Sequence, residues 1–265
     1  MEAVVKADRS AQIRQYLYAT GPASVQAIAG AVGASLATVR RDLQVLEADG
    51  VILRDHGGAR IAERAGVEVA FEQRERLNLA AKRAIADAAY GLIEPDTTIF
   101  LDAGTTVHQL ARRLRLNPMR LHVVSNCIPI AQELGGVAGV TVTLLGGRLR
   151  PENASMVGML TERALEELWF DTLFLGVGAI AEDGVISSLD ADEAQANRLM
   201  LMRARRKVLL ADATKFGQRL TYRVAGLSAD MSLITDAALP LAWTRQLQDF
   251  GCQVTVVKPG VGTWT

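Results

Sequence analysis

Cysteine is scarce in this 265-residue sequence, which holds two cysteines and no CxxC pair. Cys127 and Cys252 lie inside or beside apolar runs, which predicts reduced thiols rather than a disulfide framework or a zinc site. An excess of one charge is also lacking, because 29 Lys and Arg residues balance 29 Asp and Glu residues. Without net charge the chain has no long-range attraction to nucleic acid or to an anionic membrane, so any DNA binding must come from a local patch.

Long apolar runs are missing as well. No uninterrupted apolar segment approaches the about 18 residues that cross a bilayer, and Met1–Ser10 is charged rather than apolar. We therefore expect no membrane span and a cytoplasmic location. The composition, 49% hydrophobic and 22% charged, is that of a folded chain, and the length suits one small and one larger domain.

The first fifty residues have the spacing of three amphipathic helices. The first is expected within Ala7–Gly21, and the second begins after Ser24 as its cap and ends at Gly33. The third is expected over Ser35–Ala48, with Gly50 as its stop. A short helix, a tight turn and a third helix with basic residues outward is the layout that enters a DNA major groove.

The third helix has one apolar side and one polar side. Val39, Leu43 and Leu46 share the apolar side, while Arg41 and Gln44 point the other way. Two short apolar pieces then flank the segment 54–58, which predicts a hairpin wing with a basic tip. Periodicity alone leaves open a plain three-helix bundle with a solvated charged face.

The exact amino-acid sequence of this segment favours the DNA-binding layout over the plain three-helix bundle. "SLATVRRDLQVLEADGVILRDHGGAR", from Ser35 to Arg60, closely resembles the DNA-binding signature of the DeoR family of bacterial regulators. The resemblance implies a winged helix-turn-helix, predicted here over residues 1–62, that binds double-stranded operator DNA. Asp42 points toward the core and is expected to orient an arginine. The expected DNA contacts are Ser35, Thr38, Arg40, Arg41, Gln44, Arg54, His56 and Gly57.

Strands and helices alternate in the remaining two hundred residues. We predict a connecting segment over 63–79 and an α/β domain over 80–265, with a mostly parallel sheet covered on both faces. The predicted strands are Thr97–Leu101, Leu121–Val124, Val140–Leu145, Thr172–Val177, Lys207–Ala211, Ser232–Thr235 and Gln253–Val257. The predicted helices are Ala80–Ile93, Val107–Leu114, Ile128–Leu134, Leu160–Leu168 and Glu193–Arg205.

Polar residues cluster after the carboxyl ends of these strands, where ligands bind in such sheets. Gly104-Thr105-Thr106 directly precedes a helix, so backbone N–H groups, two hydroxyls and the positive helix end surround one point, as a phosphate requires. Lys215 supplies a countercharge, whereas Gly146, Gly147 and Gly178 are expected to serve only their turns. The expected effector contacts are Asp102, Gly104, Thr105, Thr106, Ser125, Asn126, Gly176, Glu193, Asp212 and Lys215.

The likeness to the DeoR family continues through this half in the blocks "LDAGTT", "VVSNCIPIAQEL", "LLGGRLRPENASMVG", "FDTLFLGVGAI", "DEAQANRLM" and "LLADATKFG". It implies an effector domain similar to ribose-5-phosphate isomerase, with a phosphorylated sugar held at the Gly-Thr-Thr loop. Ser125 stands where the family usually has Thr, and Asn197 where Lys or Arg is common, which puts in doubt a phosphate contact from that helix.

The sequence thus predicts a transcriptional repressor of sugar-metabolism genes, released from DNA by a phosphorylated sugar. A homodimer or homotetramer is expected because one winged unit reaches only a half-site. The alternative is a sugar-phosphate isomerase with Asp102 or Glu193 as the base and Lys215 polarising a carbonyl. No catalytic residue, metal or cofactor is expected, and His108 is predicted to be a solvated or capping histidine.

Overall fold

The computed structural model describes residues 2–48, 52–55, 57–61, 71 and 74–258. The chain divides into two compact units, Met1–Ala70 and Phe71–Thr265. Each unit has a hydrophobic core of its own. Phe71–Leu79, which the sequence assigns to the connecting segment, falls within the second unit, and the buried side chain of Phe71 agrees with that placement.

The first unit is a winged helix-turn-helix. It contains α1 (Glu2–Thr20), β1 (Ala23–Ser24), α2 (Val25–Val32), α3 (Leu36–Ala48), β2 (Ile52–Asp55) and β3 (Gly58–Ile61). Ser24 caps α2 by accepting a hydrogen bond from the Ala27 N–H at 3.2 Å, and Gly33 ends it with a φ of 62°. These ends are the predicted ones. Ile13, Ile28, Val39 and Leu43 from the three helices are fully buried together.

The predicted wing is present, with one strand more than the sequence indicated. β2 pairs antiparallel with β3, and Arg54 lies opposite Ala59 in the register. The two-residue strand β1 adds to the free edge of β3. Two residues are too few for a periodic pattern, which is why the sequence did not reveal β1. The wing therefore belongs to a three-stranded sheet that joins α2 to the hairpin.

The second unit is built on a parallel sheet of seven strands, in the order β15-β14-β12-β9-β4-β5-β6. All seven predicted strands are confirmed, with differences of a few residues at some ends. Their bounds are β4 (Thr97–Leu101), β5 (Leu121–Ser125), β6 (Val140–Leu144), β9 (Phe170–Gly176), β12 (Ala204–Leu210), β14 (Met231–Asp236) and β15 (Gln253–Val257).

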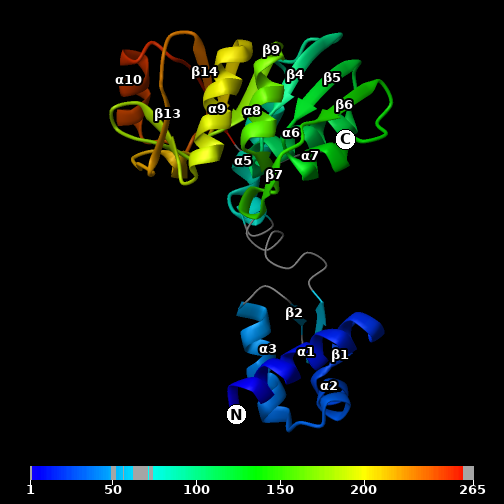
Figure 1. Ribbon diagram of the computed structural model, residues 1–265. Coiled ribbons are helices and arrows are strands. Elements are labelled where there is room, and N and C mark those ends of the chain that lie inside the picture. The colour runs from blue at the N-terminus through cyan, green and yellow to red at the C-terminus, as the bar shows by residue number, and fades with distance from the viewer. Residues whose placement is uncertain (1, 49–51, 56, 62–70, 72–73, 259–265) are drawn as a thin grey trace. The chain divides into compact units, whose positions relative to one another are not determined.

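Helices cover both faces of this sheet, so alternate residues of each strand pack into two different hydrophobic cores. Ile99 and Phe174 pack with one group of helices, whereas Phe100 and Leu173 pack with the other. The first group is α5 (Leu79–Tyr90), α6 (Thr105–Leu116) and α7 (Ile128–Leu134). The second is α8 (Met159–Glu166), α9 (Ala191–Arg203) and α10 (Leu241–Asp249), with α8 and α9 side by side (Figure 1). The sequence predicted five of these helices but not α10.

Short antiparallel additions stand outside the main sheet, and the sequence analysis did not identify them. The strands are β7 (Arg148–Arg150), β8 (Ser155–Val157), β10 (Ala179–Ile180), β11 (Val185–Ser188) and β13 (Tyr222–Gly226), and the single 3-10 turns are η1 (Pro151–Asn153) and η2 (Ala213–Lys215). β7 pairs with β8, and β11 lies between β10 and β13. Most of these pieces are only two to four residues long.

The strand order reverses direction at one point, between β4 and β9. β5 and β6 follow β4 toward one edge, while β9, β12, β14 and β15 extend toward the other. The segments that leave β4 and β9 therefore diverge and open a crevice beyond their carboxyl ends, which is where ligands bind in open parallel sheets. Gly104 and Gly176 face each other across this point.

Candidate DNA-contact surface and ligand cavity

The polar side of α3 is exposed in the first unit. Arg40, Arg41 and Gln44 are exposed, and Thr38 is half-buried. Ser35 precedes the helix and accepts a hydrogen bond from the Thr38 N–H at 3.2 Å, which fixes the first turn. The side of α3 that carries two arginines is therefore accessible, as a recognition helix requires.

A hollow of about 360 Å³ lies between this helix and the wing. Arg40 and Arg54 line it, together with Ser24 and Gly57. The guanidinium of Arg54 lies 3.5 Å from the Glu47 carboxylate, an exposed pair that is weak in water. His56, the other predicted contact on the wing, lies outside the described residues. Two arginines on one hollow match the pattern of contacts to a phosphate backbone.

Asp42 has the role that the sequence indicated. Its side chain is buried, and its carboxylate accepts hydrogen bonds from Arg9 at 2.5 and 3.2 Å. A carboxylate in this position holds α1 against α3 and is turned away from the exposed side of α3. Asp42 therefore orients an arginine, although that arginine comes from α1 rather than from α3.

The second unit has a cavity of about 330 Å³ at the crevice between β4 and β9. This volume is within the range of small-molecule sites. The structure brings seven of the predicted effector contacts together here: Gly104, Thr105, Thr106, Gly176, Glu193, Asp212 and Lys215 line the cavity. They come from the segments after β4 and β12, from the last residue of β9 and from the first turn of α9.

The first turn of α6 forms part of the wall. Gly104 precedes the helix and provides no side-chain cap, so the first N–H groups of α6 have no side-chain acceptor of that kind. Thr105 and Thr106 are buried and add hydroxyl groups beside these N–H groups. The helix dipole adds partial positive charge at the same place. This wall has the features of an anion site.

Four cationic side chains line the same cavity, and the sequence analysis named only Lys215. The others are Arg74, Lys82 and Arg150. Burial lowers the pKa of Lys82 and of Arg74 from their ordinary values. The Lys82 ammonium donates hydrogen bonds to the carbonyls of Arg74 and of Leu77, the latter at 2.7 Å. These cations surround a space large enough for a small anion.

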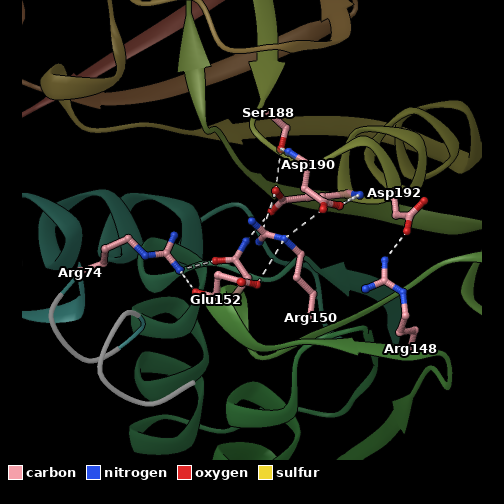
Figure 2. Close-up of polar contacts among 9 residues, drawn as sticks. Arg74, Arg148, Arg150, Glu152, Ser188, Asp190 and Asp192 are labelled. Atoms are coloured by element: carbon pink, nitrogen blue, oxygen red, sulfur yellow. Dashed lines mark hydrogen bonds and ion pairs between the residues drawn. The ribbon is translucent and has the colours of Figure 1, made fainter. Parts of the chain in front are cut away.

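Glu193 is the centre of a polar network on another part of the wall. Its carboxylate accepts hydrogen bonds from Asn153 and, at 2.6 Å, from the Ser188 hydroxyl. Arg150 lies 3.5 Å from the same carboxylate. Figure 2 shows Arg150 pointing toward Glu152 and Asp190 as well, at 3.9 and 3.7 Å.

Arg74 joins this network from the segment that precedes α5. Its guanidinium donates a hydrogen bond to the Asn153 side-chain oxygen at 2.5 Å and another to the carbonyl of Glu152 (Figure 2). Asn153 is buried, and its amide links Arg74 on one side to Glu193 on the other. Arg74, which precedes α5 in the chain, is thereby tied to the cavity wall.

Asp102 is fully buried behind the cavity and does not line it. Its carboxyl accepts a hydrogen bond from the Gly176 N–H at 3.1 Å, which bridges the segments after β4 and β9. Burial, and next the nearby charge of Glu193, raise the pKa of Asp102 well above its usual range. A shift in this direction favours the neutral acid, which, unlike a carboxylate, does not repel an anion in the cavity.

Ser125 and Asn126 do not line the cavity either. The Ser125 hydroxyl donates to the Leu101 carbonyl at 2.6 Å and accepts from the Cys127 N–H, so it ties β4 to β5. The Asn126 amide donates to the Met156 carbonyl at 3.3 Å. Their roles as effector contacts stay predictions. Asp212 does line the cavity, but it also caps η2 by accepting from the Thr214 N–H at 3.0 Å.

His108 differs from the sequence-based expectation of a solvated or capping residue. It is buried on α6, its Nδ1 lies 2.9 Å from Glu75, and its Nε2 lies 3.6 Å from Glu133. The ring also packs beside Phe71, with centroids 5.6 Å apart. Hydrogen bonding to His108 lowers the pKa of Glu75. The helical period placed His108 on α6, but nothing local in the sequence revealed the carboxylates that come from elsewhere in the chain.

Two of the glycines that were expected to serve only their turns are required by packing. A side chain at Gly147 would place its Cβ 2.2 Å from the Thr161 hydroxyl and 2.8 Å from the Val157 carbonyl, and the residue has a φ of 151°. A Cβ at Gly178 would lie 2.7 Å from the Ser187 carbonyl. Both positions therefore exclude other residues for structural reasons, although Gly178 also lies on the cavity wall.

Comparison with known families agrees with both units. Residues 9–65 match the model of the DeoR-like helix-turn-helix domain, and residues 77–237 match that of the DeoR C terminal sensor domain. The chain belongs to the DeoR family. It is a DNA-binding transcriptional regulator and not an enzyme, so the isomerase alternative is set aside. The DeoR sensor-domain match includes Leu77 and every cavity residue after it.

Relatives match this DeoR regulator over most of their length. The putative aga operon transcriptional repressor of Escherichia coli O157:H7 is 33% identical, over 94% of this chain and 93% of its own. The lactose phosphotransferase system repressor of Streptococcus mutans serotype c is 35% identical, over 87% and 92%. The glycerol-3-phosphate regulon repressor of Escherichia coli (strain K12) is 30% identical, over 82% and 85%.

Among solved structures, ribose 5-phosphate isomerase A from Methanocaldococcus jannaschii has a TM-score of 0.39 and 16% identity, and the match covers 52% of this chain and 55% of that one. A likeness of this extent concerns part of the fold alone. Within the described residues of the DeoR regulator, no helix is both long and apolar enough to span a bilayer. The same residues contain no cluster of three or more side chains suited to hold a metal ion.

Proposed function

We propose that this regulator represses genes of sugar metabolism and leaves its operator when a phosphorylated sugar occupies the cavity between β4 and β9. The observation that carries the proposal is the convergence of four cationic side chains, two buried threonines and the start of α6 on one space of about 330 Å³. A phosphate ester satisfies such a lining, because its oxygens accept from N–H, hydroxyl and ammonium donors together.

The names of relatives support this effector class. Two relatives are repressors named for the lactose phosphotransferase system and for the glycerol-3-phosphate regulon. Glycerol 3-phosphate is itself a phosphate ester with free hydroxyl groups. The network around Glu193 suits hydroxyl groups, since its carboxylate and the Asn153 amide offer both an acceptor and a donor.

The regulator acts in the cytoplasm as a homodimer or homotetramer on double-stranded operator DNA. One α3 and one wing contact a single half-site, so two copies are needed for a palindromic operator. Release by the effector requires that the effector bind the DNA-free state more tightly than the DNA-bound state. In the DNA-bound state, the predicted contacts on α3 and the wing bind the operator. In the DNA-free state, the predicted effector contacts around the cavity bind the sugar phosphate.

The test uses the full chain and the DNA upstream of its own gene. Fluorescence anisotropy would follow release of that DNA by a panel of sugar and polyol monophosphates, and calorimetry would measure binding of the same compounds. One of them is expected to bind and to release the DNA. Lys215→Gln should weaken that ester by about tenfold or more, whereas Lys258→Gln, an exposed lysine that does not line the cavity, should not. Failure of every ester to bind contradicts the proposal.

A further inference from the structure

The charges on the cavity wall allow a narrower statement about the ligand, and this statement rests on the proposed function. The charged side chains on the lining are Arg74, Lys82, Arg150, Lys215, Glu193 and Asp212. The lining alone, before the carboxylates outside it are counted, has four cationic and two anionic groups, a formal excess of two positive charges. A phosphate monoester carries about two negative charges at neutral pH, so it should bind where the excess of positive charge remains.

The excess is not spread evenly over the wall. Arg150 has three carboxylates within 4 Å, those of Glu193, Asp190 and Glu152. Of these three, Glu193 lines the cavity and the other two contact Arg150 from outside the lining. The Arg150 side chain is only 12% exposed, so these carboxylates neutralise its guanidinium at close range. Arg150 is therefore a donor of hydrogen bonds to a ligand rather than a source of uncompensated charge.

The two lysines are in the opposite situation. The Lys82 ammonium donates to backbone carbonyls, which are neutral. Within residues 74–258, neither Lys82 nor Lys215 forms an ion pair with a carboxylate. Asp212 also lines the cavity and its negative charge acts on Lys82, so the lysine pair keeps an excess of one positive charge toward a ligand, with the start of α6 on the same wall. The lysine pair is the part of the lining that suits a dianion.

The Glu193 network (Glu193, Asn153, Ser188 and Arg150) presents the other kind of surface. Its carboxylate already accepts two hydrogen bonds, and the carboxylates of Asp190 and Glu152 add negative charge behind it. Figure 2 shows these acidic groups gathered around Arg150, while Asp192 pairs separately with Arg148. A second anion placed against this network would meet like charge in a partly buried site, which costs affinity.

We propose that the cavity is specific for compounds with a single phosphate and an otherwise uncharged, hydroxyl-bearing body, and that it excludes bisphosphates and phosphorylated acids. The phosphate binds at the lysine pair, and the hydroxyl groups exchange hydrogen bonds with the Glu193 network. Discrimination comes from the carboxylates of Glu193, Asp190 and Glu152, because they outnumber Arg150 and Arg74, the two cations that a second anion could use there.

The experiment compares matched ligands by calorimetry on the full chain. The pairs are fructose 6-phosphate with fructose 1,6-bisphosphate, glucose 6-phosphate with 6-phosphogluconate, and glycerol 3-phosphate with 3-phosphoglycerate. The member with one phosphate and no other anionic group is expected to bind, and its partner to bind more than about tenfold more weakly. A bisphosphate or phosphorylated acid that binds as tightly as its partner overturns this inference and leaves the proposed function intact. Binding of neither member in any pair overturns both.

Variants test the cause of the discrimination. The double variant Glu152→Gln, Asp190→Asn removes two charges behind Arg150, and asparagine still caps α9 at position 190. It should improve binding of the doubly anionic compounds by about tenfold and change binding of the monophosphate much less. Asp192→Asn is the matched control, because Asp192 pairs with Arg148 and does not line the cavity. An unchanged ratio of affinities in the double variant would contradict the electrostatic cause.

Discussion

At the scale of single residues, Arg41 is the sharpest test of DNA recognition. It is exposed on the polar side of α3, where a base edge or a phosphate could meet it. Arg41→Ala is expected to weaken binding to the operator by about 1 to 3 kcal/mol if it reads a base. Anisotropy titrations at two salt concentrations would measure the loss. Arg205→Ala, an exposed arginine of the second unit, is the control, and equal affinities of the two variants would remove Arg41 from the interface.

Asp102 makes stability depend on pH in a defined direction. Its pKa is raised in the folded chain, mainly by burial, so the folded state holds a proton that the unfolded state has lost above about pH 4. The unfolding free energy of the second unit should therefore fall as pH rises above that value, by up to about 1.4 kcal/mol per pH unit.

Asp102→Asn should flatten this decline, since asparagine has no proton to lose. Urea unfolding between about pH 5 and pH 8 would measure it. Asp249→Asn, an exposed residue on α10, should keep the slope of the wild type. If the slope is the same with and without the carboxyl at position 102, Asp102 does not hold the proton.

At the scale of elements, regular patterns made most of the fold predictable. The seven strands and five helices of the second unit follow continuous apolar or periodic runs, such as Ile128–Leu134. In the first unit, the Ser24 side chain caps the start of α2, and Gly33 ends that helix because glycine accepts a left-handed φ. β7, β10 and η1 are too short to carry a period, and their geometry is set by contacts with distant residues. α10 is different, because Leu241–Asp249 is as clearly amphipathic as the helices that were predicted, and its helical pattern was missed.

The site was predictable only where it follows the strands. Thr105 and Lys215 come directly after strands, and the rule for parallel sheets placed them correctly on one edge. Arg74 and Asn153 lie in a weakly patterned segment and in η1, so only tertiary structure brings them to the cavity. Gly146 and Gly147 predicted a turn before Arg150, but the sequence around this turn did not reveal that Arg150 contacts Glu193.

Replacing Asn153 tests whether η1 holds residues 74–78, which precede α5, against the cavity wall. Asn153→Ala removes the acceptor for Arg74 and the donor to Glu193, both hydrogen bonds to charged groups in a buried setting. The second unit should lose about 1.5 to 3 kcal/mol of stability, and amide exchange should accelerate at residues 74–78. Exchange measured by mass spectrometry, with the exposed Asn117→Ala as control, checks this. Unchanged exchange would mean that other contacts hold the segment.

At the scale of the whole molecule, two separate cores predict two unfolding transitions. Trp169 and Trp243 lie in the second unit, Trp264 lies outside the described residues, and the first unit has no tryptophan, so tryptophan fluorescence does not report the first unit. Circular dichroism also reports the helices of the first unit. The two signals should give transitions that do not coincide, and an ester that binds the cavity should stabilise the fluorescence transition selectively. A single shared transition that shifts as one with the ester would show that the units unfold together.

Arg74 stands close in sequence to the DNA-binding unit. That unit ends at Ala70, and four residues later a guanidinium lines the cavity and donates to Asn153 and to the Glu152 carbonyl. We therefore expect a ligand that takes over one of these acceptors to act first on the residues that precede α5, before any change in the seven-stranded sheet.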